Sequence, residues 1–307
     1  MSAVPEGVER DFPLARLTTI RTGGPAEFFA AVSTGERLES LLRWAAEEDL
    51  EVGVVGSGSN LLIADAGVRG LVMKLDGDLA LIEQDGDRLV CGGGARLPQA
   101  SARAASLGLS GLEFGVNIPG TVGGAVRMNA NAYGGELGRA LEWVDVTTPA
   151  GTDRRPPEAL GFQYRRSNLG PREVVARASF QLSRADPAAV KETLADMRAS
   201  RRAAQPSGIK TFGSTFKNPD DPKAEGRTAG RLLEEAGCKG MESGSARFSP
   251  KHANFIENVD GRASTADVLN LMAAGRRRVR ERFGVTLEPE VQLLGDAEFP
   301  FGAGEDS

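Results

Sequence analysis

The feature that most constrains this chain is a glycine-rich stretch at residues 115–135, GVNIPGTVGGAVRMNANAYGG, in which six of 21 residues are glycine. A shorter string of the same kind, VGSGSNLL, occupies residues 55–62 and begins within the apolar run at residues 52–55. Glycine permits backbone conformations and close approaches that side chains forbid, and such loops expose N–H groups to phosphates. The two strings together predict a nucleotide or dinucleotide site.

Two common phosphate-binding motifs do not fit these strings. A dinucleotide fingerprint that starts at Gly56 requires glycine or alanine at position 61, where the chain has Leu61. A P-loop requires lysine after its second glycine, and the closest match, residues 208–214, places Ser214 there. The sequence therefore predicts neither a Rossmann domain nor a P-loop ATPase.

The composition is that of an ordinary globular protein of 307 residues, with 40% hydrophobic and 26% charged residues. This excludes disordered and fibrous chains, and the length predicts two domains. The chain has 37 basic and 42 acidic residues, and the resulting net charge of −5 gives no general attraction to nucleic acid or anionic lipid. An anionic ligand would need a local cluster of basic side chains.

Cysteine and histidine are scarce. Cys91 and Cys238 are far apart and lack CxxC spacing, and His252 is the single histidine, so we expect no metal site and no disulfide framework. The first ten residues have neither a basic start nor an apolar stretch, and no segment has the roughly 18–20 apolar residues that span a bilayer. We expect a cytoplasmic protein.

Hydrophobic periodicity and turn residues predict an alternation of strands and helices. A capping box at residues 33–36 predicts the start of the first helix, and residues 184–187 are a candidate boundary. The expected helices cover residues 38–45, 97–107, 187–204, 226–236 and 264–283. The expected strands cover residues 52–55, 71–75, 79–82, 88–91, 141–146, 174–182, 253–256 and 285–294.

Taken together, VGSGSNLL at residues 55–62 and IPGTVGGA at residues 118–125 resemble the two FAD-pyrophosphate loops of the vanillyl-alcohol-oxidase-like flavoproteins. The resemblance implies an α+β fold: a two-lobed FAD-binding domain at residues 1–185 and a C-terminal α+β substrate domain at residues 186–307. FAD is expected to be non-covalent, because His252 and both cysteines lie outside these loops. The implied FAD contacts are Gly56, Ser57, Gly58, Ser59, Asn60, Pro119, Gly120, Thr121, Gly123 and Gly124.

Further motifs narrow the resemblance to the UDP-N-acetylenolpyruvoylglucosamine reductase family, from about residue 18 to residue 295. They are TGGPA at residues 22–26, GTVGGAVRMNA at 120–130, YRRS at 164–167, GSTFKNP at 213–219, KHANF at 251–255 and LEPEV at 287–291. The strings VGGAV at residues 122–126 and MNA at residues 128–130 resemble the type II branch of the family. The chain also lacks the additional loop tyrosine of type I, because its two tyrosines, Tyr133 and Tyr164, both lie in the motifs above. Asn117 and Asn131 stand where the family commonly has glycine.

Membership would imply reduction of a UDP-sugar enolpyruvyl ether to UDP-N-acetylmuramate for peptidoglycan synthesis, with FAD as cofactor and NADPH as reductant. Reduction leaves negative charge that extends into the substrate carboxylate, which the guanidinium of Arg165 is suited to hold bidentately. The resemblance carries over Ser214 as proton donor and Glu290 as the catalytic glutamate. It implies no metal, nucleic acid, membrane or obligate protein partner.

Substrate contacts are expected from Tyr164, Lys217 and Asn218. For the pyrophosphate, charge alone adds Arg201, Arg202 and Lys210 to Lys217 as a local basic cluster.

Other functions have weaker support. Another oxidase of the same flavin fold is the main alternative, and a non-catalytic nucleotide- or sugar-binding module is a second, although the presence of Arg165, Ser214 and Glu290 argues against the latter. A hydrolase that pairs Ser214 with His252 lacks the G-x-S-x-G elbow. The arginines at residues 276–278 lie on an amphipathic helix, so a solvated basic face is favoured over nucleic-acid binding.

Overall fold

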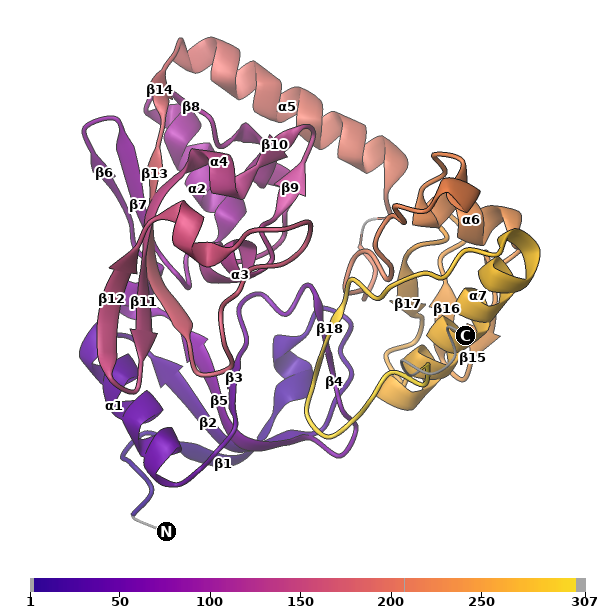
Figure 1. The fold of residues 1–307 in the computed structure, drawn as a ribbon, viewed down its shortest axis with the longest axis horizontal. Coiled ribbons are helices and arrows are strands. Elements are labelled where there is room, and N and C mark those ends of the chain that lie inside the picture. The colour runs from indigo at the N-terminus through magenta and orange to yellow at the C-terminus, as the bar shows by residue number, and fades with distance from the viewer. Residues whose placement is uncertain (1–2, 207, 302–307) are drawn as a thin grey trace. The chain divides into compact units, whose positions relative to one another are not determined.

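The computed structural model describes residues 3–206 and 208–301 (Figure 1). The chain forms two compact units, each made of separated segments. The first unit contains Met1–Arg10, Phe28–Ser57 and Gly70–Ala203, and the second contains Asp11–Glu27, Gly58–Arg69 and Ala204–Ser307. These bounds differ from a single division at residue 185, because α5 (Pro187–Ala204) packs with the first unit and two early segments join the second.

One lobe is built on a four-stranded sheet in the order β1 (Glu9–Pro13), β2 (Pro25–Val32), β5 (Val68–Leu75) and β3 (Val52–Val54). Strand β3 and most of β2 and β5 belong to the first unit. Parallel pairing places Val52 opposite Leu71. Helix α1 (Gly35–Glu47) buries its apolar side with this sheet, and the Thr34 side chain accepts the Arg37 N–H. The N-cap residue of α1 is therefore Thr34, whereas the predicted capping box begins one residue earlier, at Ser33.

The other lobe is a five-stranded antiparallel sheet in the order β12, β11, β13, β7, β6. Its strands are β6 (Ile82–Asp85), β7 (Arg88–Gly92), β11 (Leu141–Thr148), β12 (Gly151–Arg155) and β13 (Val174–Gln181). The predicted strand at residues 79–82 is wrong. Residues 79 and 80 belong to a 3-10 helix, η2 (Gly77–Ala80), and β6 begins only at Ile82. The N–H groups of Asp76 and Asp78 bond the carbonyls of Val32 and Ser33 and turn the chain back.

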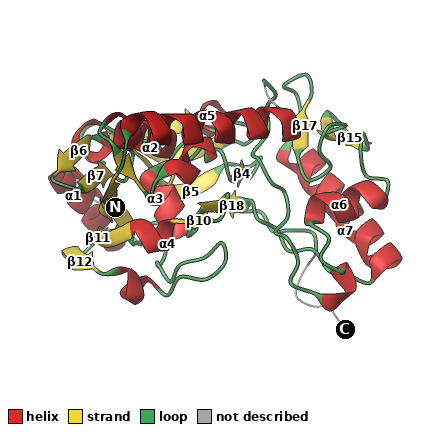
Figure 2. Ribbon diagram, turned by 90° about the horizontal axis from the view of Figure 1, so that it is seen from above, coloured by secondary structure: helices red, strands yellow, loops and turns green. Residues whose placement is uncertain are grey.

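Helices and short hairpins complete the first unit. Helix α5 places Val190 and Leu194 in one apolar cluster with Ala105 of α2 (Leu97–Ser106) and Val116 of η3 (Glu113–Asn117). Figure 2 shows α5 as one continuous helix. The remaining elements are α3 (Val122–Arg127), α4 (Leu137–Ala140), η4 (Pro157–Leu160), the hairpin of β9 (Asn131–Ala132) and β10 (Gly135–Glu136), and β8 (Leu109–Ser110) paired with β14 (Ser183–Arg184).

The second unit packs helices α6 (Ala229–Glu235) and α7 (Thr265–Phe283) with an antiparallel sheet of β15 (Glu242–Ser243), β16 (Ala246–Phe248) and β17 (Ile256–Asn258). Strand β4 (Leu61–Ile63) pairs in parallel with β18 (Gln292–Leu294). Two 3-10 turns, η1 (Leu14–Leu17) and η5 (Pro222–Ala224), belong here too. The strand predicted at residues 253–256 is displaced to β17, and the strand predicted at residues 285–294 is shortened to β18.

The start of α7 ties early and late parts of the second unit together. Ser264 and Asp267 form a capping box, and the Asp65 carboxylate accepts the N–H groups of Thr265 and Ala266 at 2.8 and 3.0 Å. The hydroxyl of Thr265 also bonds the Ile63 carbonyl. Residues 58–69 therefore contact the C-terminal part of the chain, although 200 positions separate Asp65 from Thr265.

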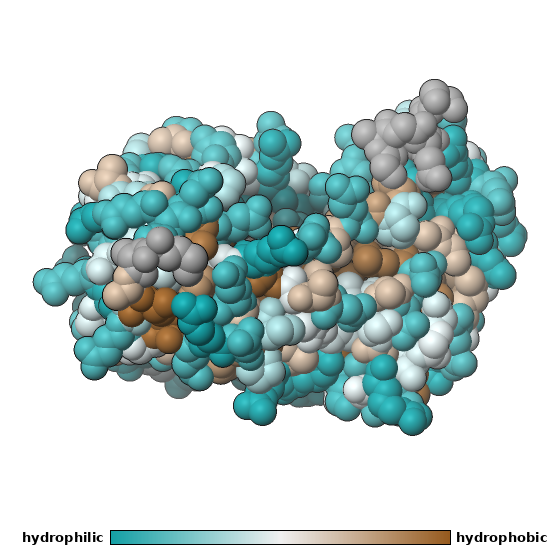
Figure 3. Space-filling view, turned by 90° about the horizontal axis from the view of Figure 1, so that it is seen from below, coloured by the Kyte–Doolittle hydropathy of each residue, from teal (hydrophilic) through white to brown (hydrophobic). Residues whose placement is uncertain are grey.

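Over residues 3–206 and 208–301, no helix is both long enough and apolar enough to cross a membrane. The face drawn in Figure 3 is mainly hydrophilic, with separate hydrophobic patches.

His252 has a structural role in the second unit. Its Nδ1 accepts the Asn254 N–H at 3.2 Å, and its ring packs edge-on against Phe255 at 4.9 Å between centroids. A Cβ at Gly230 would lie 2.8 Å from the His252 Cε1, so the ring fills the space beside α6. Burial lowers the pKa of His252, which favours the neutral ring.

We expect His252 to make stability depend on pH. Because its pKa is lower in the folded than in the unfolded state, its contribution is complete above about pH 6.5 and is lost as the pH falls toward the folded-state value. His252→Asn keeps an acceptor without the titration, so its urea midpoint should fall less steeply over that range. The chain has one histidine, so an identical slope in both proteins would refute this assignment.

Candidate active site

A pocket in the first unit lies where the two glycine-rich loops meet. It contains about 490 Å³ of empty space, part of it open to solvent. Both loops contribute to its wall, although some 65 positions separate them. The lining residues are Val54, Val55, Gly56, Leu75, Gly93, Gly94, Thr121, Gly123, Gly124, Arg127, Glu173, Val174 and Val175.

The loops approach too closely for side chains at several of these positions. A Cβ at Gly56 would lie 2.4 Å from Thr121 Oγ1, and a Cβ at Gly93 would lie 1.9 Å from the Val175 carbonyl oxygen. Backbone atoms cannot move aside as a flexible side chain can, so Gly93 is required by the fold itself. Gly124 differs, because its nearest such contact is Thr121 Oγ1 at 3.5 Å. Its absent side chain leaves room on an exposed part of the pocket wall.

The pocket suits the FAD that the sequence predicts. The Ser57 hydroxyl is next to the lining residue Gly56, is buried and has no hydrogen-bond partner among the described residues. This is uncommon for a buried polar atom, and a bound ligand would account for it by supplying the partner. Lys74 Nζ donates to the Gly56 carbonyl at 3.1 Å and so fixes the loop. Gly56, Ser57, Thr121, Gly123 and Gly124 would hold the cofactor, whose isoalloxazine would supply the redox chemistry.

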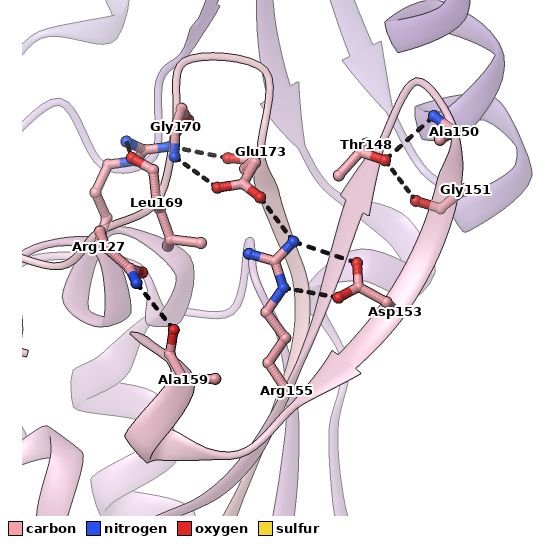
Figure 4. Close-up of polar contacts among 11 residues, drawn as sticks. Arg127, Thr148, Ala150, Gly151, Asp153, Arg155, Ala159, Leu169, Gly170 and Glu173 are labelled. Atoms are coloured by element: carbon pink, nitrogen blue, oxygen red, sulfur yellow. Dashed lines mark hydrogen bonds and ion pairs between the residues drawn. The ribbon is translucent and has the colours of Figure 1, made fainter. Parts of the chain in front are cut away.

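Arg127 and Glu173 are pocket residues that sequence reasoning missed (Figure 4). The Arg127 guanidinium donates to the carbonyls of Leu169, Gly170 and Glu173 at 3.1, 2.9 and 2.8 Å. Burial lowers the pKa of Arg127, an effect opposed by Glu173. The sequence signal that could have identified Arg127 is that it is the single charged residue of the glycine-rich stretch at residues 115–135.

Glu173 is held from two sides. Its carboxylate accepts from Arg155 Nη2 and from the Gly170 N–H, each at 2.6 Å (Figure 4). Hydrogen bonding by Arg155 lowers the pKa of Glu173, so this carboxylate is ionised at neutral pH. Arg127 and Glu173 therefore brace the segment at residues 169–173 against the pocket.

The other predicted FAD contacts have different surroundings. Pro119 is exposed, and the Gly120 carbonyl accepts the Leu97 N–H at 3.0 Å in the first unit. Gly58, Ser59 and Asn60 belong to the second unit. The Gly58 carbonyl accepts from the Thr19 N–H and hydroxyl, both at 3.0 Å. FAD contacts by these residues stay a prediction.

Arg165 occupies the corner of a tight turn in the first unit. Gln163 and Arg166 exchange two backbone hydrogen bonds of 3.0 and 3.2 Å, which leaves Tyr164 and Arg165 as the corner residues. Arg165 has a φ of 56°, the left-handed region that favours glycine. Its guanidinium carbon lies 5.0 Å from the centre of the Tyr164 ring, and its Nη1 donates to Asn131 Oδ1 at 2.6 Å.

Ser214 and Glu290 are brought together in the second unit by backbone pairing. The Thr215 N–H bonds the Asn254 carbonyl at 2.8 Å, and the Thr215 carbonyl accepts the Glu290 N–H at 2.9 Å. Ser214 forms a bridge with Phe255 on one side, while Asn60 Nδ2 donates to the Glu290 carbonyl at 3.1 Å on the other. Asn60, predicted as a cofactor contact, thus fixes the backbone of Glu290.

The predicted substrate residues are engaged within the protein. Lys217 Nζ pairs with Glu288 Oε2 at 3.1 Å, and Asn218 Oδ1 accepts the Ala229 N–H at 3.1 Å at the start of α6. The predicted basic cluster is divided between the units. Arg201 and Arg202 lie in the first unit, whereas Lys210 and Lys217 lie in the second.

Neither cysteine has the character of a reactive thiol. Burial raises the pKa of Cys91 to about 12 and that of Cys238 to about 11. Within residues 3–206 and 208–301, no group of three or more His, Cys, Asp or Glu side chains is placed to hold a metal ion.

The two-lobed first unit and its glycine-lined pocket define a flavoprotein with the FAD-binding fold of the vanillyl-alcohol-oxidase type. Residues 26–155 match the family model described as "FAD binding domain". Residues 205–294 match the model described as "UDP-N-acetylenolpyruvoylglucosamine reductase, C-terminal domain". The chain belongs to the UDP-N-acetylenolpyruvoylglucosamine reductase family.

Individual relatives extend the match over nearly the whole chain. A UDP-N-acetylenolpyruvoylglucosamine reductase of Anaeromyxobacter dehalogenans is 45% identical over 94% of this chain and 85% of its own length. The reductase 2 of Symbiobacterium thermophilum is 44% identical over 95% and 93%. The crystal structure of the reductase from Thermus caldophilus has a TM-score of 0.81 at 38% identity and covers 94% of this chain and 98% of that one.

Gly124→Ala should separate cofactor binding from folding. Alanine fits the protein and favours the helix by up to about 1 kcal/mol, so thermal stability of the apoprotein should be equal or higher. The added methyl group would intrude on the pocket, and the purified variant should hold less FAD by absorbance. Gly35→Ala is the matched control, because it places alanine in the first turn of α1 with no atom within 4 Å of its Cβ. Equal FAD content in all three proteins would show that the cofactor does not approach Gly124.

Proposed function

We propose that this chain reduces UDP-N-acetylenolpyruvoylglucosamine to UDP-N-acetylmuramate, with NADPH as reductant and non-covalent FAD as cofactor. The observation that carries the proposal is the family match over 94% of the chain together with the presence of Arg165, Ser214 and Glu290 at the motif positions. We also infer a cytoplasmic enzyme that needs no obligate protein partner.

Arg165 is assigned to the substrate carboxylate. When bound, FAD supplies hydride transfer from NADPH to the enolpyruvyl double bond. Reduction of that bond places negative charge on the carbon next to the carboxylate, and a guanidinium can hold both carboxylate oxygens as this charge grows. The left-handed backbone at Arg165 supports the assignment, since strained residues often lie at functional sites.

Ser214 is assigned the proton that completes the lactyl group, and Glu290 assists. A serine hydroxyl is a weak acid, so its proton must be delivered from a fixed position. The pairing of residues 214–217 with residues 254–255 on one side and 288–290 on the other supplies that fixed backbone. The side chain of Asn254 strengthens it by bonding both the N–H and the carbonyl of Phe216, at 2.9 and 2.8 Å.

Lys217 is assigned to the substrate pyrophosphate. Its present partner, Glu288, has a side chain that is 72% exposed, and ion pairs at such surfaces are weak. A dianionic pyrophosphate can therefore replace Glu288 at the ammonium group. Tyr164 and Asn218 are assigned to the substrate by resemblance, and the amide of Asn218 also supports α6.

Arg165→Lys should lose substrate reduction while FAD remains bound. Lysine keeps the charge but lacks the planar fork, so we expect a loss on the order of 10²–10³-fold in kcat/KM for the enolpyruvyl substrate. The adjacent, exposed Arg166 supplies the matched control, and Arg166→Lys should remain near the parental value. A fully active Arg165→Lys variant would reduce Arg165 to a turn residue.

Ser214→Ala should leave flavin reduction intact and impair flavin reoxidation. Flavin reduction by NADPH needs no proton from this hydroxyl, so its rate should stay close to parental. Flavin reoxidation by the enolpyruvyl substrate should slow by ~10²–10⁴-fold, as for removal of one positioned acid. Stopped-flow absorbance measures both steps.

Thr215→Val is the control for Ser214→Ala. It removes the neighbouring buried hydroxyl, which has no hydrogen-bond partner in the described part of the chain, and should alter neither step. If Ser214→Ala slowed both steps equally, or left reoxidation unchanged, the proton donor would have to be another group.

A further inference from the structure

The turn that carries Arg165 is braced by two asparagines of one short segment, Asn129 and Asn131. Asn129 Nδ2 donates to the Gln163 carbonyl at 3.3 Å, at the base of the turn. Asn131 reaches the tip, where its Oδ1 accepts from Arg165 Nη1 at 2.6 Å and its carbonyl oxygen lies 3.4 Å from the same nitrogen. All of these residues belong to the first unit.

Asn131 contacts the Arg165 guanidinium through a neutral amide. A carboxylate at this position would compensate the charge of the guanidinium and compete with an anionic ligand. An amide oxygen fixes one nitrogen of the fork and contributes no negative charge. Asn131 therefore holds one nitrogen of the guanidinium without itself adding a negative charge.

Asn131 is itself held in place. It lies on β9, opposite Glu136 on β10, and the connecting residues Tyr133 and Gly134 both have positive φ, of 51° and 78°. Positive φ at both corner positions is the conformation of a type I′ hairpin turn, whose twist suits short antiparallel strands. The Tyr133 hydroxyl accepts from Asn117 Nδ2 at 3.0 Å, which fastens the tip of the hairpin.

We propose that Asn131 is a positioning residue for the reaction, which acts by orienting the Arg165 guanidinium toward the substrate carboxylate. The inference rests on the proposed role of Arg165. A glycine at this position would offer no side-chain oxygen, so this bond to Arg165 Nη1 depends on the asparagine side chain. Arg165 is a corner residue with left-handed backbone, and the bond from Asn131 joins its side chain to the neighbouring hairpin of β9 and β10.

The test compares Asn131→Ala in two backgrounds. In the otherwise native holoenzyme, loss of a hydrogen bond to a charged group should lower the single-turnover rate of substrate reduction by about 10-fold. Flavin reduction by NADPH should be unchanged. In an Arg165→Ala background the same substitution should have less than a two-fold effect, roughly the limit of additivity between independent sites.

Asn168→Ala is the matched control. It removes an amide hydrogen bond of 2.9 Å, to the Ala159 carbonyl, that supports the same loop without touching Arg165. It should leave the single-turnover rate near the parental value. An equal loss for Asn131→Ala in both backgrounds, or no loss in the native one, would overturn the inference.

Asn131→Asp keeps the proposal testable should the alanine variant fold poorly. Aspartate preserves shape and an acceptor oxygen but adds the competing charge, so the dissociation constant of the substrate for the oxidised holoenzyme should rise about 10-fold or more. An unchanged constant would overturn the inference. Arg165→Ala separates the role of Arg165 from the role of Asn131. Full activity of Arg165→Ala would refute the role of Arg165 itself. If Arg165→Ala is inactive and Asn131→Ala is fully active, only the role of Asn131 is refuted.

Discussion

The first unit depends on backbone-to-backbone contacts at its glycine-rich loops. At Gly93 even one carbon atom would collide with the Val175 carbonyl of β13, and at Gly94 with the Leu75 carbonyl of β5. These contacts bring the ends of strands from both sheets to one place and leave a pocket between them. Gly93 and Gly94 are required because the strands pack too closely there for a side chain. At Gly124 the protein itself has room for a side chain, but that side chain would occupy space in the pocket.

Around this pocket, polar side chains hold irregular backbone that no strand or helix supports. Arg127 gathers three carbonyls of residues 169–173, and Arg155 and the Gly170 N–H occupy the carboxylate of Glu173. Left-handed backbone at Asn129, Tyr133 and Arg165 lies in the same unit and is fastened by side-chain hydrogen bonds or ring contacts. These bonds supply partners to backbone groups that no strand or helix pairs. In the Arg165 turn, the Asn131 amide oxygen accepts from the guanidinium.

The second unit uses amides for the same purpose. Asn254 bonds the backbone of Phe216 on both its N–H and its carbonyl, and Asn60 bonds the carbonyl of Glu290. Each amide supplies a donor or an acceptor in the manner of a neighbouring strand. Three segments distant in sequence are thereby registered against one another, which places the Ser214 and Glu290 segments side by side.

The sequence by itself determined the cofactor class, the family and most of the long elements. Helix α5 begins and ends where apolar spacing predicts, and α7 begins after the predicted Ser264, because periodicity and caps are local properties. Local signals failed at residues 79 and 80, where bonds from Asp76 and Asp78 to Val32 and Ser33 accompany a 3-10 turn in place of a strand. Only the tertiary structure showed Arg127 and Glu173 in the pocket wall, Asn60 on the Glu290 backbone and Asn131 on Arg165. Such contacts join positions 34 to 230 residues apart, and hydrogen bonds over those separations leave no periodic pattern in the chain.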